Sequence, residues 1–202
     1  MNTKNCLLIF TRNPELGKVK TRLAKTLGDT KALDIYKFLI KHTVAITKNL
    51  KGTKQVYYSV KVREQDYWDD GIFEKHQQEG DDLGIRMQHA FEAAFSEGYK
   101  NVIIIGSDMY DLSQEDIEQA FGNLENNDVV IGPAEDGGYY LLGMKTLIPE
   151  VFKNKAWGTD SVLEDTKADL KSYSCNLLEE RNDVDYYEDI KDHPAFKNFL
   201  DL

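Results

Sequence analysis

Residues 6–23 read CLLIFTRNPELGKVKTRL, and this stretch contains the strand, loop and helix signals that decide the fold. Residues 6–11 are apolar and lack a helical period, which is typical of a buried strand. Pro14 and Gly17 then interrupt the chain and predict a loop. Helical patterns follow the loop over residues 21–27 and 29–49. The chain therefore begins with a strand, a basic loop and a helix.

Outward from this stretch, strand and helix patterns continue to alternate. Strands are expected at 55–60, 102–105, 129–131, 139–142 and 173–178, with a possible short strand at 72–73. Further helices are expected at 83–95, from Ser113 and up to about residue 170, and a helical tail should close the chain. Ser113 with Asp116, and Ser161 with Glu164, have the spacing of capping boxes. This order predicts one α/β domain over residues 1–202, with a mostly parallel sheet covered on both faces.

In such a sheet, ligands bind beyond the carboxyl ends of the strands, where the basic loop lies. Arg12, Lys18, Lys20 and Arg22 concentrate positive charge within one loop and one helical turn. Gly17 would let the backbone approach a phosphate closely, and the following helix N-terminus favours anions. The spacing is not that of a Walker loop. A phosphate site is the favoured interpretation, and a solvated basic helix face is the alternative.

Carboxylates follow two of the expected strands. Asp108 comes directly after the strand at 102–105, where it could share Mg²⁺ with ligand oxygens. Asp111 could cap the next helix or support Asp108. Asp183 and Asp185 alternate along an extended segment, so only one of them should face a metal directly. We favour Asp185 as the ligand and keep Asp183 in reserve; a cap for the tail is the alternative.

Residues 132–143 combine glycines, two tyrosines and Asp136 between two expected strands. Asp136 could act as a base toward an acceptor or bind its hydroxyl groups, although a simple turn explains the glycines as well. Gln78 and Arg86 lie at a loop-to-helix entry that could border a nucleotide, or could merely begin a helix. Residues 157–160 could form a mobile flap over an acceptor, or a buried tryptophan with a capping turn.

The composition excludes several classes of protein. Of 202 residues, 41% are hydrophobic, which indicates a globular protein. The formal net charge of −10 argues against broad nucleic-acid binding. No apolar run approaches the roughly 20 residues of a membrane span, and no signal-peptide cleavage site follows Met1–Asn5, so we expect a cytoplasmic location. Cys6 and Cys175 are expected to be free thiols.

The stretch from Phe10 to Leu23 resembles the opening signature of a bacterial family of largely uncharacterised GT-A-like transferases. These are usually labelled glycosyltransferases and are related to molybdenum-cofactor and phospholactate guanylyltransferases. Other segments appear in the family's expected order, and the similarity covers nearly the whole chain: residues 78–87, 106–108, 132–143, 157–160 and 183–185. The resemblance implies a three-layer α/β/α nucleotide-diphospho-sugar transferase (GT-A) fold.

The resemblance also implies how the site is arranged. Mg²⁺ or Mn²⁺ would join phosphates to Asp108 and Asp185, and the loop carrying Arg12, Lys20 and Arg22 would receive the nucleotide's phosphates. Together with the residue-level reasoning, this makes Lys20, Asp108 and Asp136 the expected catalytic residues. The expected partners are a nucleotide or nucleotide sugar and an unknown small-molecule acceptor.

Three functions are compatible with these residues. The first is glycosyl transfer from a nucleotide-diphospho-sugar, and the second is nucleotidyl transfer from an NTP with release of pyrophosphate. The third is a non-catalytic nucleotide-binding module. It is motivated by Tyr110, which replaces the proline that relatives commonly have two residues after the strand-end Asp, and is expected to alter the loop at the metal site.

Overall fold

The computed structural model describes residues 4–200 and contains a seven-stranded sheet with the strand order β3-β2-β1-β4-β6-β5-β7. β6 is antiparallel to both its neighbours, whereas all other neighbours pair in parallel. The predicted mostly parallel sheet is therefore confirmed. Residues 1–3 and 201–202 of the expected domain lie outside the described residues. The strands are β1 (Asn5–Thr11), β2 (Thr53–Tyr58), β3 (Glu74–Gln77), β4 (Asn101–Gly106), β5 (Val129–Pro133), β6 (Tyr139–Met144) and β7 (Cys175–Leu177).

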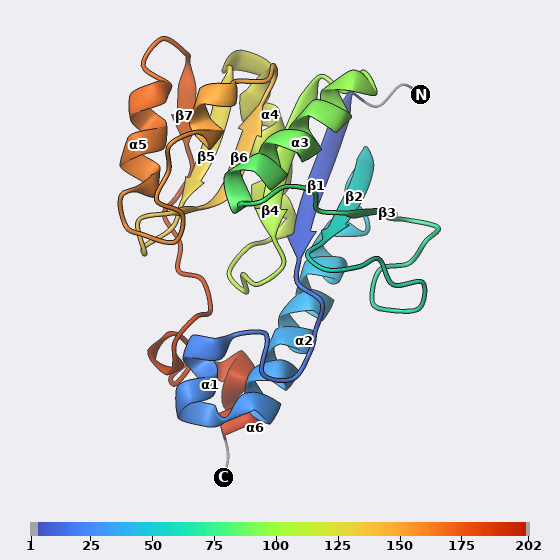
Figure 1. Ribbon diagram of the computed structural model, residues 1–202, viewed down its shortest axis with the longest axis vertical. Coiled ribbons are helices and arrows are strands. Elements are labelled where there is room, and N and C mark those ends of the chain that lie inside the picture. Colours follow the sequence, from blue (N-terminus) through green and yellow to red (C-terminus); the bar gives the residue numbers. More distant parts are fainter. Residues whose placement is uncertain (1–3, 201–202) are drawn as a thin grey trace.

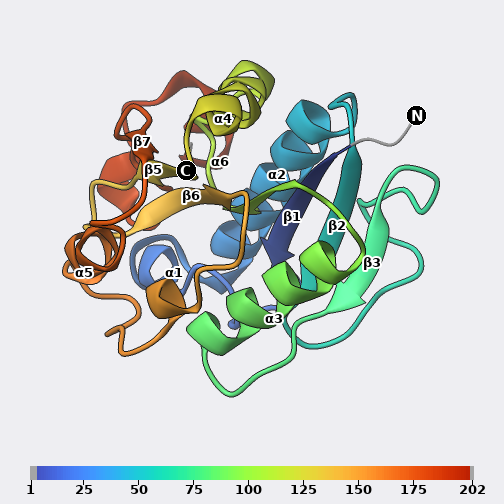
Figure 2. The same ribbon diagram turned by 90° about the horizontal axis from the view of Figure 1, so that it is seen from above.

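Helices cover both faces of this sheet, which confirms the three-layer fold. Figure 2 shows α2 and α4 on one side of the strands and α3 and α5 on the other. No helix in the described residues is both long and apolar enough to cross a bilayer. The helices are α1 (Thr21–Leu27), α2 (Asp29–Thr47), α3 (Leu83–Ser96), α4 (Gln114–Asn126), α5 (Val162–Asp169) and α6 (Lys197–Leu200), with 3-10 turns at Pro149–Phe152, Tyr187–Asp189 and Pro194–Phe196.

The two central strands are buried on both faces, which explains their continuous apolar sequence. Leu7 and Ile9 of β1 pack in the layer that contains α2 and α4. Cys6 and Leu8 point the other way, into the layer that contains α3. Because side chains alternate along a strand, one apolar run supplies both cores. β1 is thereby held rigidly at the centre of the molecule.

The register of β1 and β4 sets the position of the loops that follow them. Phe10 of β1 lies opposite Gly106 of β4 and Tyr57 of β2. The three strands are parallel, so the segments after them leave the sheet side by side. Arg12 and Asp108, each two residues beyond a paired position, consequently emerge next to one another.

A third apolar cluster joins the end of the chain to its beginning. Leu23 of α1 and Leu39 of α2 pack with Val184, Ile190 and Phe196 of the C-terminal segment. Figure 1 shows α1 and α6 together beyond the carboxyl ends of the strands. The C-terminal segment therefore crosses the same edge of the sheet as the basic loop.

Three local expectations are corrected by the structure. The strand expected at 72–73 lies instead at Glu74–Gln77, because the N–H groups of residues 72 and 73 both donate to the Asp69 carbonyl in a turn. Ser161 does not cap α5: its backbone is already helical, and its hydroxyl donates to Asp165. The helical tail consists mainly of 3-10 turns and the short α6. The capping box of α4, formed by Ser113 and Asp116, is present as predicted.

Candidate active site

A large cleft of about 740 Å³ opens where β1 and β4 end. It is lined by ten of the residues that the sequence suggested for the site. Asp111 and Gly17 do not line it; Gly17 has a φ of 72° and turns the loop beside Asp29. The suggested residues on the cleft are Arg12, Lys18, Lys20, Arg22, Gln78, Arg86, Asp108, Asp136, Asp183 and Asp185.

Tyr36 of α2 holds the loops after β1 and β4 together. Its buried hydroxyl accepts a hydrogen bond from the backbone N–H of Arg12 at 2.8 Å. The same hydroxyl lies 3.1 Å from Ser107 Oγ and 3.3 Å from Thr11 Oγ1. Burial raises the pKa of Tyr36, so the phenol stays neutral and can take part in all these contacts. This network fixes the floor of the cleft.

Asn13 fastens the basic loop to the segment after β2. Its side-chain oxygen accepts hydrogen bonds from the N–H groups of Val60 and Lys61, and its Nδ2 donates to the Lys61 carbonyl. The residue is almost fully buried. Asn13 therefore satisfies backbone groups of a loop that has no ladder of its own.

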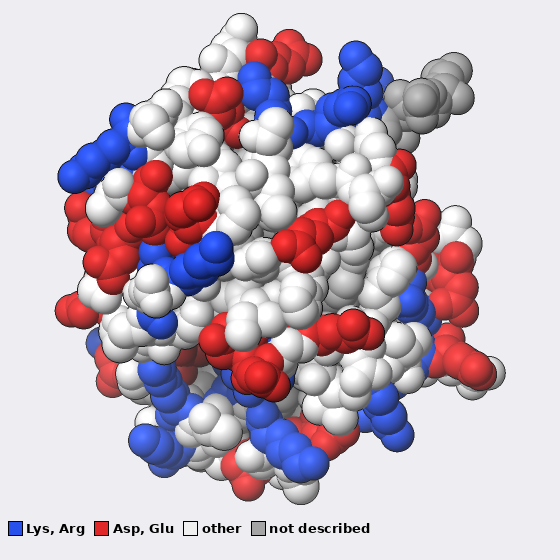
Figure 3. All heavy atoms as spheres, turned by 45° about the horizontal axis from the view of Figure 1, so that its top comes forward, with Lys and Arg blue, Asp and Glu red and all other residues white. Residues whose placement is uncertain are grey.

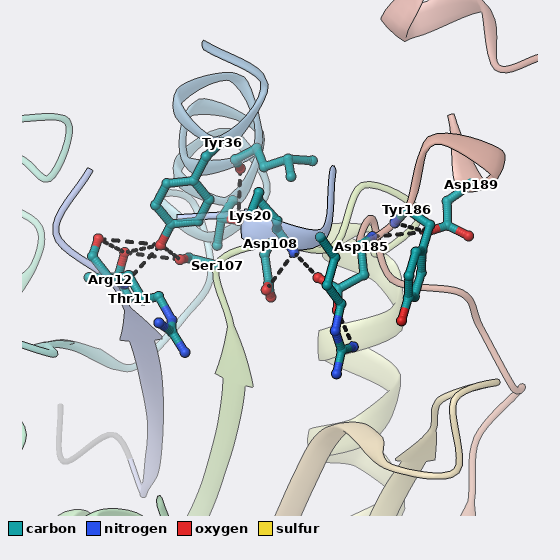
Figure 4. Close-up of polar contacts among 12 residues, drawn as sticks. Thr11, Arg12, Lys20, Tyr36, Ser107, Asp108, Asp185, Tyr186 and Asp189 are labelled. Carbon is teal, nitrogen blue, oxygen red and sulfur yellow. Dashed lines mark hydrogen bonds and ion pairs between the residues drawn. The ribbon is translucent and has the colours of Figure 1, made fainter. Parts of the chain in front are cut away.

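Lys20 lies at the centre of the charged network (Figure 4). Its Nζ is 2.9 Å from Asp108 Oδ2 and 3.0 Å from Asp185 Oδ1. The lysine side chain is only 4% exposed, whereas Asp108 and Asp185 are 42% and 27% exposed. One ammonium group thus joins the two carboxylates that the sequence suggested as metal ligands.

The charges in this network reinforce one another. Burial favours the neutral acid at Asp108, but the Lys20 ammonium outweighs it and holds the pKa of the carboxyl below its usual value. Burial would likewise lower the pKa of Lys20, but Asp108 and Asp185 raise it above the ordinary lysine value. Lys20 and Asp108 are therefore both ionised at neutral pH.

Asp185 is positioned by its own segment as well as by its ion pairs. Arg22 Nη1 contacts Asp185 Oδ2 at 2.8 Å. The backbone N–H groups of Asp185 and Tyr186 both donate to the carboxylate of Asp189, three to four residues onward (Figure 4). The suggested cap of the tail is thus made by Asp189, which leaves the side chain of Asp185 free to face Lys20.

Asp136 and Asp183 face the cleft from the other side. Asp136 lies in the turn between β5 and β6, where its Oδ1 accepts from the N–H of Gly138 at 2.9 Å. The turn interpretation is therefore realised, and the residue also lines the cleft. Burial and the charge of Asp185 raise the pKa of Asp183 to about 6.

Gln78 and Arg86 combine a cleft-lining position with structural contacts. Gln78 Nε2 donates to the Tyr57 carbonyl at 2.9 Å and to the Thr11 carbonyl at 3.4 Å, which joins the ends of β1 and β2. Arg86 Nε donates to the Gly80 carbonyl at 2.8 Å. The guanidinium of Arg86 is therefore tethered to the Gly80 carbonyl, and the residue lines the cleft.

A second pocket, the apolar chamber, adjoins the large cleft and encloses about 260 Å³. Its wall includes Phe10, Met87, Tyr139 and Trp157. Asp108, Asp136 and Asp183 line both spaces and so mark the junction. The ring of Trp157 lies against Gly84, where an added Cβ would be 2.7 Å from the ring. The segment at 157–160 is thus a wall of this chamber.

Tyr110 packs away from the carboxylates. Its ring stacks on Phe38 and meets His193 and Phe196 edge-on. Asp108 keeps its contact with Lys20 in the same loop. Tyr110 therefore anchors the loop after β4 to the C-terminal segment. Asp111, in that loop, is half exposed and 3.8 Å from His193; it does not cap α4, since Ser113 does.

Sequence reasoning missed Tyr36, Asn13 and Asp189. Tyr36 has the spacing of an ordinary apolar residue on the face of a helix, and its hydroxyl role depends on contacts with two distant strands. Asn13, before Pro14, has the sequence pattern of an ordinary turn residue, and its partners Val60 and Lys61 lie 47 and 48 residues away. The role of Asp189 as the acceptor for the N–H groups of Asp185 and Tyr186 depends on the path of the C-terminal segment, which the sequence does not reveal.

Outside the cleft the surface carries mixed charge. Figure 3 shows acidic and basic side chains interspersed over one face of the molecule. The cleft is lined by five basic and four acidic residues, in a chain with a net charge of −10. Its arginines and lysines can bind the oxygens of a small anionic ligand.

Solved structures of other proteins share this architecture. A "putative nucleotide-diphospho-sugar transferase" from Desulfovibrio desulfuricans G20 is 32% identical, with a TM-score of 0.90 over 97% of this chain and 89% of its own. Rv0371c from Mycobacterium tuberculosis H37Rv is 9% identical, with a TM-score of 0.58 over 94% of this chain and 97% of its own. The 4-diphosphocytidyl-2C-methyl-D-erythritol synthase from Anaerococcus prevotii DSM 20548 is 9% identical, with a TM-score of 0.54 over 87% of each chain. The last two similarities show the fold alone.

Comparison of the sequence with protein-family models identifies the family of this chain. No curated protein matches the chain in sequence. A family model described as "Uncharacterized protein conserved in bacteria (DUF2064)" matches residues 42–159, more than half of the chain. The expected bacterial family is therefore confirmed. The chain has the fold of the nucleotide-diphospho-sugar transferases and belongs to the family of uncharacterized proteins conserved in bacteria, DUF2064.

Proposed function

We propose that this transferase moves a glycosyl group from a nucleotide-diphospho-sugar to a small-molecule acceptor. The observation that supports the proposal is the pairing of two spaces with opposite chemistry. The large cleft is lined by cations and carboxylates, whereas the adjoining chamber is mainly apolar. A donor with a charged diphosphate and an acceptor with an apolar part would fit such a pair, with the reacting groups at their junction.

The donor's diphosphate would lie between Arg12, Lys20 and Arg22. All three side chains line the cleft, and Arg12 and Arg22 are exposed to it. Guanidinium groups bind phosphate oxygens in a bidentate manner, and an ammonium adds a point charge. As the glycosyl bond breaks, negative charge grows on the departing diphosphate, and fixed cations stabilise it most at that moment.

The acceptor would enter from the apolar chamber and present its hydroxyl at the junction. Asp136 lies there, with Oδ1 held by the N–H of Gly138. A carboxylate in this position can accept the proton of the attacking hydroxyl as the new bond forms. The chamber's aromatic and aliphatic wall favours an acceptor that carries an apolar group.

Asp108 and Asp185 are suitable ligands for Mg²⁺ or Mn²⁺. Their oxygens already meet at a cation, the Lys20 ammonium, and carboxylate oxygens suit these metals. Among residues 4–200 no group of three or more His, Cys, Asp or Glu side chains is arranged to hold a metal, so phosphates and water would have to supply further ligands. When bound, the metal would stabilise charge on the leaving diphosphate.

A panel of NTPs and nucleotide-diphospho-sugars, tested by thermal shift with and without Mg²⁺ or Mn²⁺, examines this proposal first. We expect a metal-dependent rise in melting temperature with one nucleotide-diphospho-sugar. That donor is then incubated with hydroxylated acceptors of graded apolar size, and released NDP is measured. If no nucleotide of either class shifts the melting temperature, the proposal is wrong.

Nucleotidyl transfer is the second candidate, because the cleft carries more cations than a diphosphate requires. Besides Arg12, Lys20 and Arg22, the side chains of Lys18 and Arg86 also line it. In this reaction a phosphorylated substrate would attack the α-phosphorus of an NTP. Release of pyrophosphate on addition of an NTP and a phosphorylated acceptor would favour this candidate over glycosyl transfer. Tight binding without turnover over the whole panel would instead favour a nucleotide-binding module.

A further inference from the structure

Lys20 has an unusual backbone for a residue in this position. It lies just before α1 with φ 46° and ψ 47°, in the left-handed region, and shares a positive φ with only one other described non-glycine residue, Asn154. Such a conformation costs free energy in a residue with a Cβ, so the surrounding contacts must hold it in place. The contacts in question are those of its side chain.

The side chain of Lys20 reaches a point that two carboxylates share. Its Nζ lies 2.9 Å from Asp108 Oδ2 and 3.0 Å from Asp185 Oδ1. Mg²⁺ binds carboxylate oxygens at about 2.1 Å. A metal held by these same two oxygens would therefore lie within about 5 Å of the ammonium, on geometry alone. Lys20 and a divalent ion cannot both occupy the carboxylate pair without strong repulsion.

The charge balance of the cleft indicates why a lysine should be there. Four carboxylates line the cleft: Asp108, Asp136, Asp183 and Asp185. Without a ligand, Lys20 neutralises two of them from within, and Arg22 adds a second contact to Asp185. When phosphates enter, the same ammonium would be needed by a new set of anions in the same cleft.

We propose that Lys20 is an internal competitor of the divalent metal: it holds the Asp108–Asp185 pair in the free protein and passes to the donor's phosphates when the metal takes that pair. The inference rests on the proposed function for the identity of the incoming phosphates. Its own content is the exchange at the two carboxylates. Lys20 acts here as a positioning residue for the metal and as a direct ligand of the phosphates.

This exchange makes metal and nucleotide depend on each other. When the metal binds alone, it must displace the Lys20 ammonium while no phosphate is present to receive that charge, so the metal alone binds weakly. When the nucleotide binds alone, Lys20 moves to its phosphates and leaves the carboxylates of Asp108 and Asp185 without this cation. The nearby negative charge repels the phosphates, so the nucleotide alone also binds weakly. Together each removes the obstacle to the other, and by linkage the gain in affinity is equal for both ligands.

Direct Mn²⁺ titration of the nucleotide-free protein, followed by electron paramagnetic resonance of free Mn²⁺, tests the exchange. We compare wild type with Lys20→Met and with Lys167→Met as the matched control. Lys167 lies in α5, pairs with Glu164 at 2.7 Å and lines neither the cleft nor the apolar chamber. Lys20→Met should bind Mn²⁺ more tightly by about 5- to 150-fold, the usual range of coupling. Lys167→Met should leave Mn²⁺ affinity unchanged.

Nucleotide binding should move in the opposite direction. In the presence of saturating Mn²⁺, Lys20→Met should bind the nucleotide selected by the thermal-shift panel about tenfold more weakly or worse, because one charge-assisted contact to phosphate is lost. Equal or weaker Mn²⁺ binding in Lys20→Met, or no Mn²⁺ binding by either protein, overturns the exchange. Tighter Mn²⁺ binding with no nucleotide bound by any variant would retain the exchange and reject the proposed function.

A measurement on the wild type guards against a misfolded variant. The ¹⁵N-labelled ammonium of Lys20 can be followed by NMR, because its two ion pairs slow proton exchange. Mg²⁺ alone should change this signal little, and Mg²⁺ together with the nucleotide should shift it or remove it. A signal that stays unchanged while Mg²⁺ and nucleotide are both bound would refute the exchange without any substitution.

Discussion

Replacing Tyr36 with phenylalanine tests whether a single phenol holds the site together. The ring is retained and its packing is unchanged, so the substitution removes only the hydroxyl. Its loss leaves the partly buried N–H of Arg12 without its 2.8 Å acceptor. Thr11 and Ser107 are affected less, because Ser107 Oγ also donates to Thr11 Oγ1 at 2.9 Å. One unsatisfied hydrogen-bond donor costs about 1–3 kcal/mol, and this is the expected loss in the free energy of unfolding.

The assay is urea unfolding followed by circular dichroism, with a melting curve as a second readout. For a chain of this size, each kcal/mol lowers the melting temperature by about 2–4 °C. Nucleotide affinity, measured by calorimetry, should fall as well, since Arg12 and the loop that carries it lose their anchor. The two readouts together separate a site residue from an ordinary core residue.

Tyr99→Phe is the matched control. The Tyr99 hydroxyl donates to Thr53 Oγ1 at 2.9 Å, and neither residue lines the cleft. This variant should lose about 1 kcal/mol or less and bind nucleotide as the wild type does. If Tyr36→Phe is no less stable than Tyr99→Phe and binds nucleotide equally well, the role given to Tyr36 is wrong.

Three further changes follow from local contacts. Asp108→Ala should abolish metal-dependent nucleotide binding and leave the circular dichroism spectrum intact; unchanged affinity in calorimetry would remove Asp108 from the metal site. Asp128→Asn should lower stability at pH 7, because hydrogen bonds from Ser174 lower the pKa of Asp128 in the folded protein. A lowered folded-state pKa stabilises the fold above the unfolded pKa, so the urea midpoints of the two proteins should converge below about pH 4. A difference in midpoint that stays constant with pH would contradict this. Gly137→Ala should destabilise the fold, since φ is 86° and an added Cβ would lie 2.3 Å from the Asp160 carbonyl oxygen. In contrast, the added Cβ of Gly122→Ala in α4 would meet nothing within 4 Å, so this change should stabilise the fold by about 0.5–1 kcal/mol.

Features with a local cause could be predicted from the sequence. β1 and α1 were located within one residue, because an apolar run, a Pro and Gly loop and a helical pattern follow each other without overlap. The capping box at Ser113 was found for the same reason. Its counterpart at Ser161 failed because the preceding backbone already turns helically, which sequence spacing does not report.

The candidate site was predictable as a set of residues and not as a geometry. Strand ends share one edge of the sheet, so Arg12, Asp108 and Asp136 could be placed together on topology alone. The junction of Lys20 with both Asp108 and Asp185 could not, because it depends on where the last segment packs. That path is decided by apolar contacts of Val184, Ile190 and Phe196 with α1 and α2, which are non-local by nature.

The contact of Lys20 with Asp185 spans 165 positions of the chain. Asp185 belongs to a segment outside the strands, which apolar contacts of Val184, Ile190 and Phe196 attach to α1 and α2. Local opening of this segment would leave Lys20 with Asp108 as its one carboxylate partner of the two. The charge balance of the cleft therefore depends on how firmly the C-terminal segment is docked.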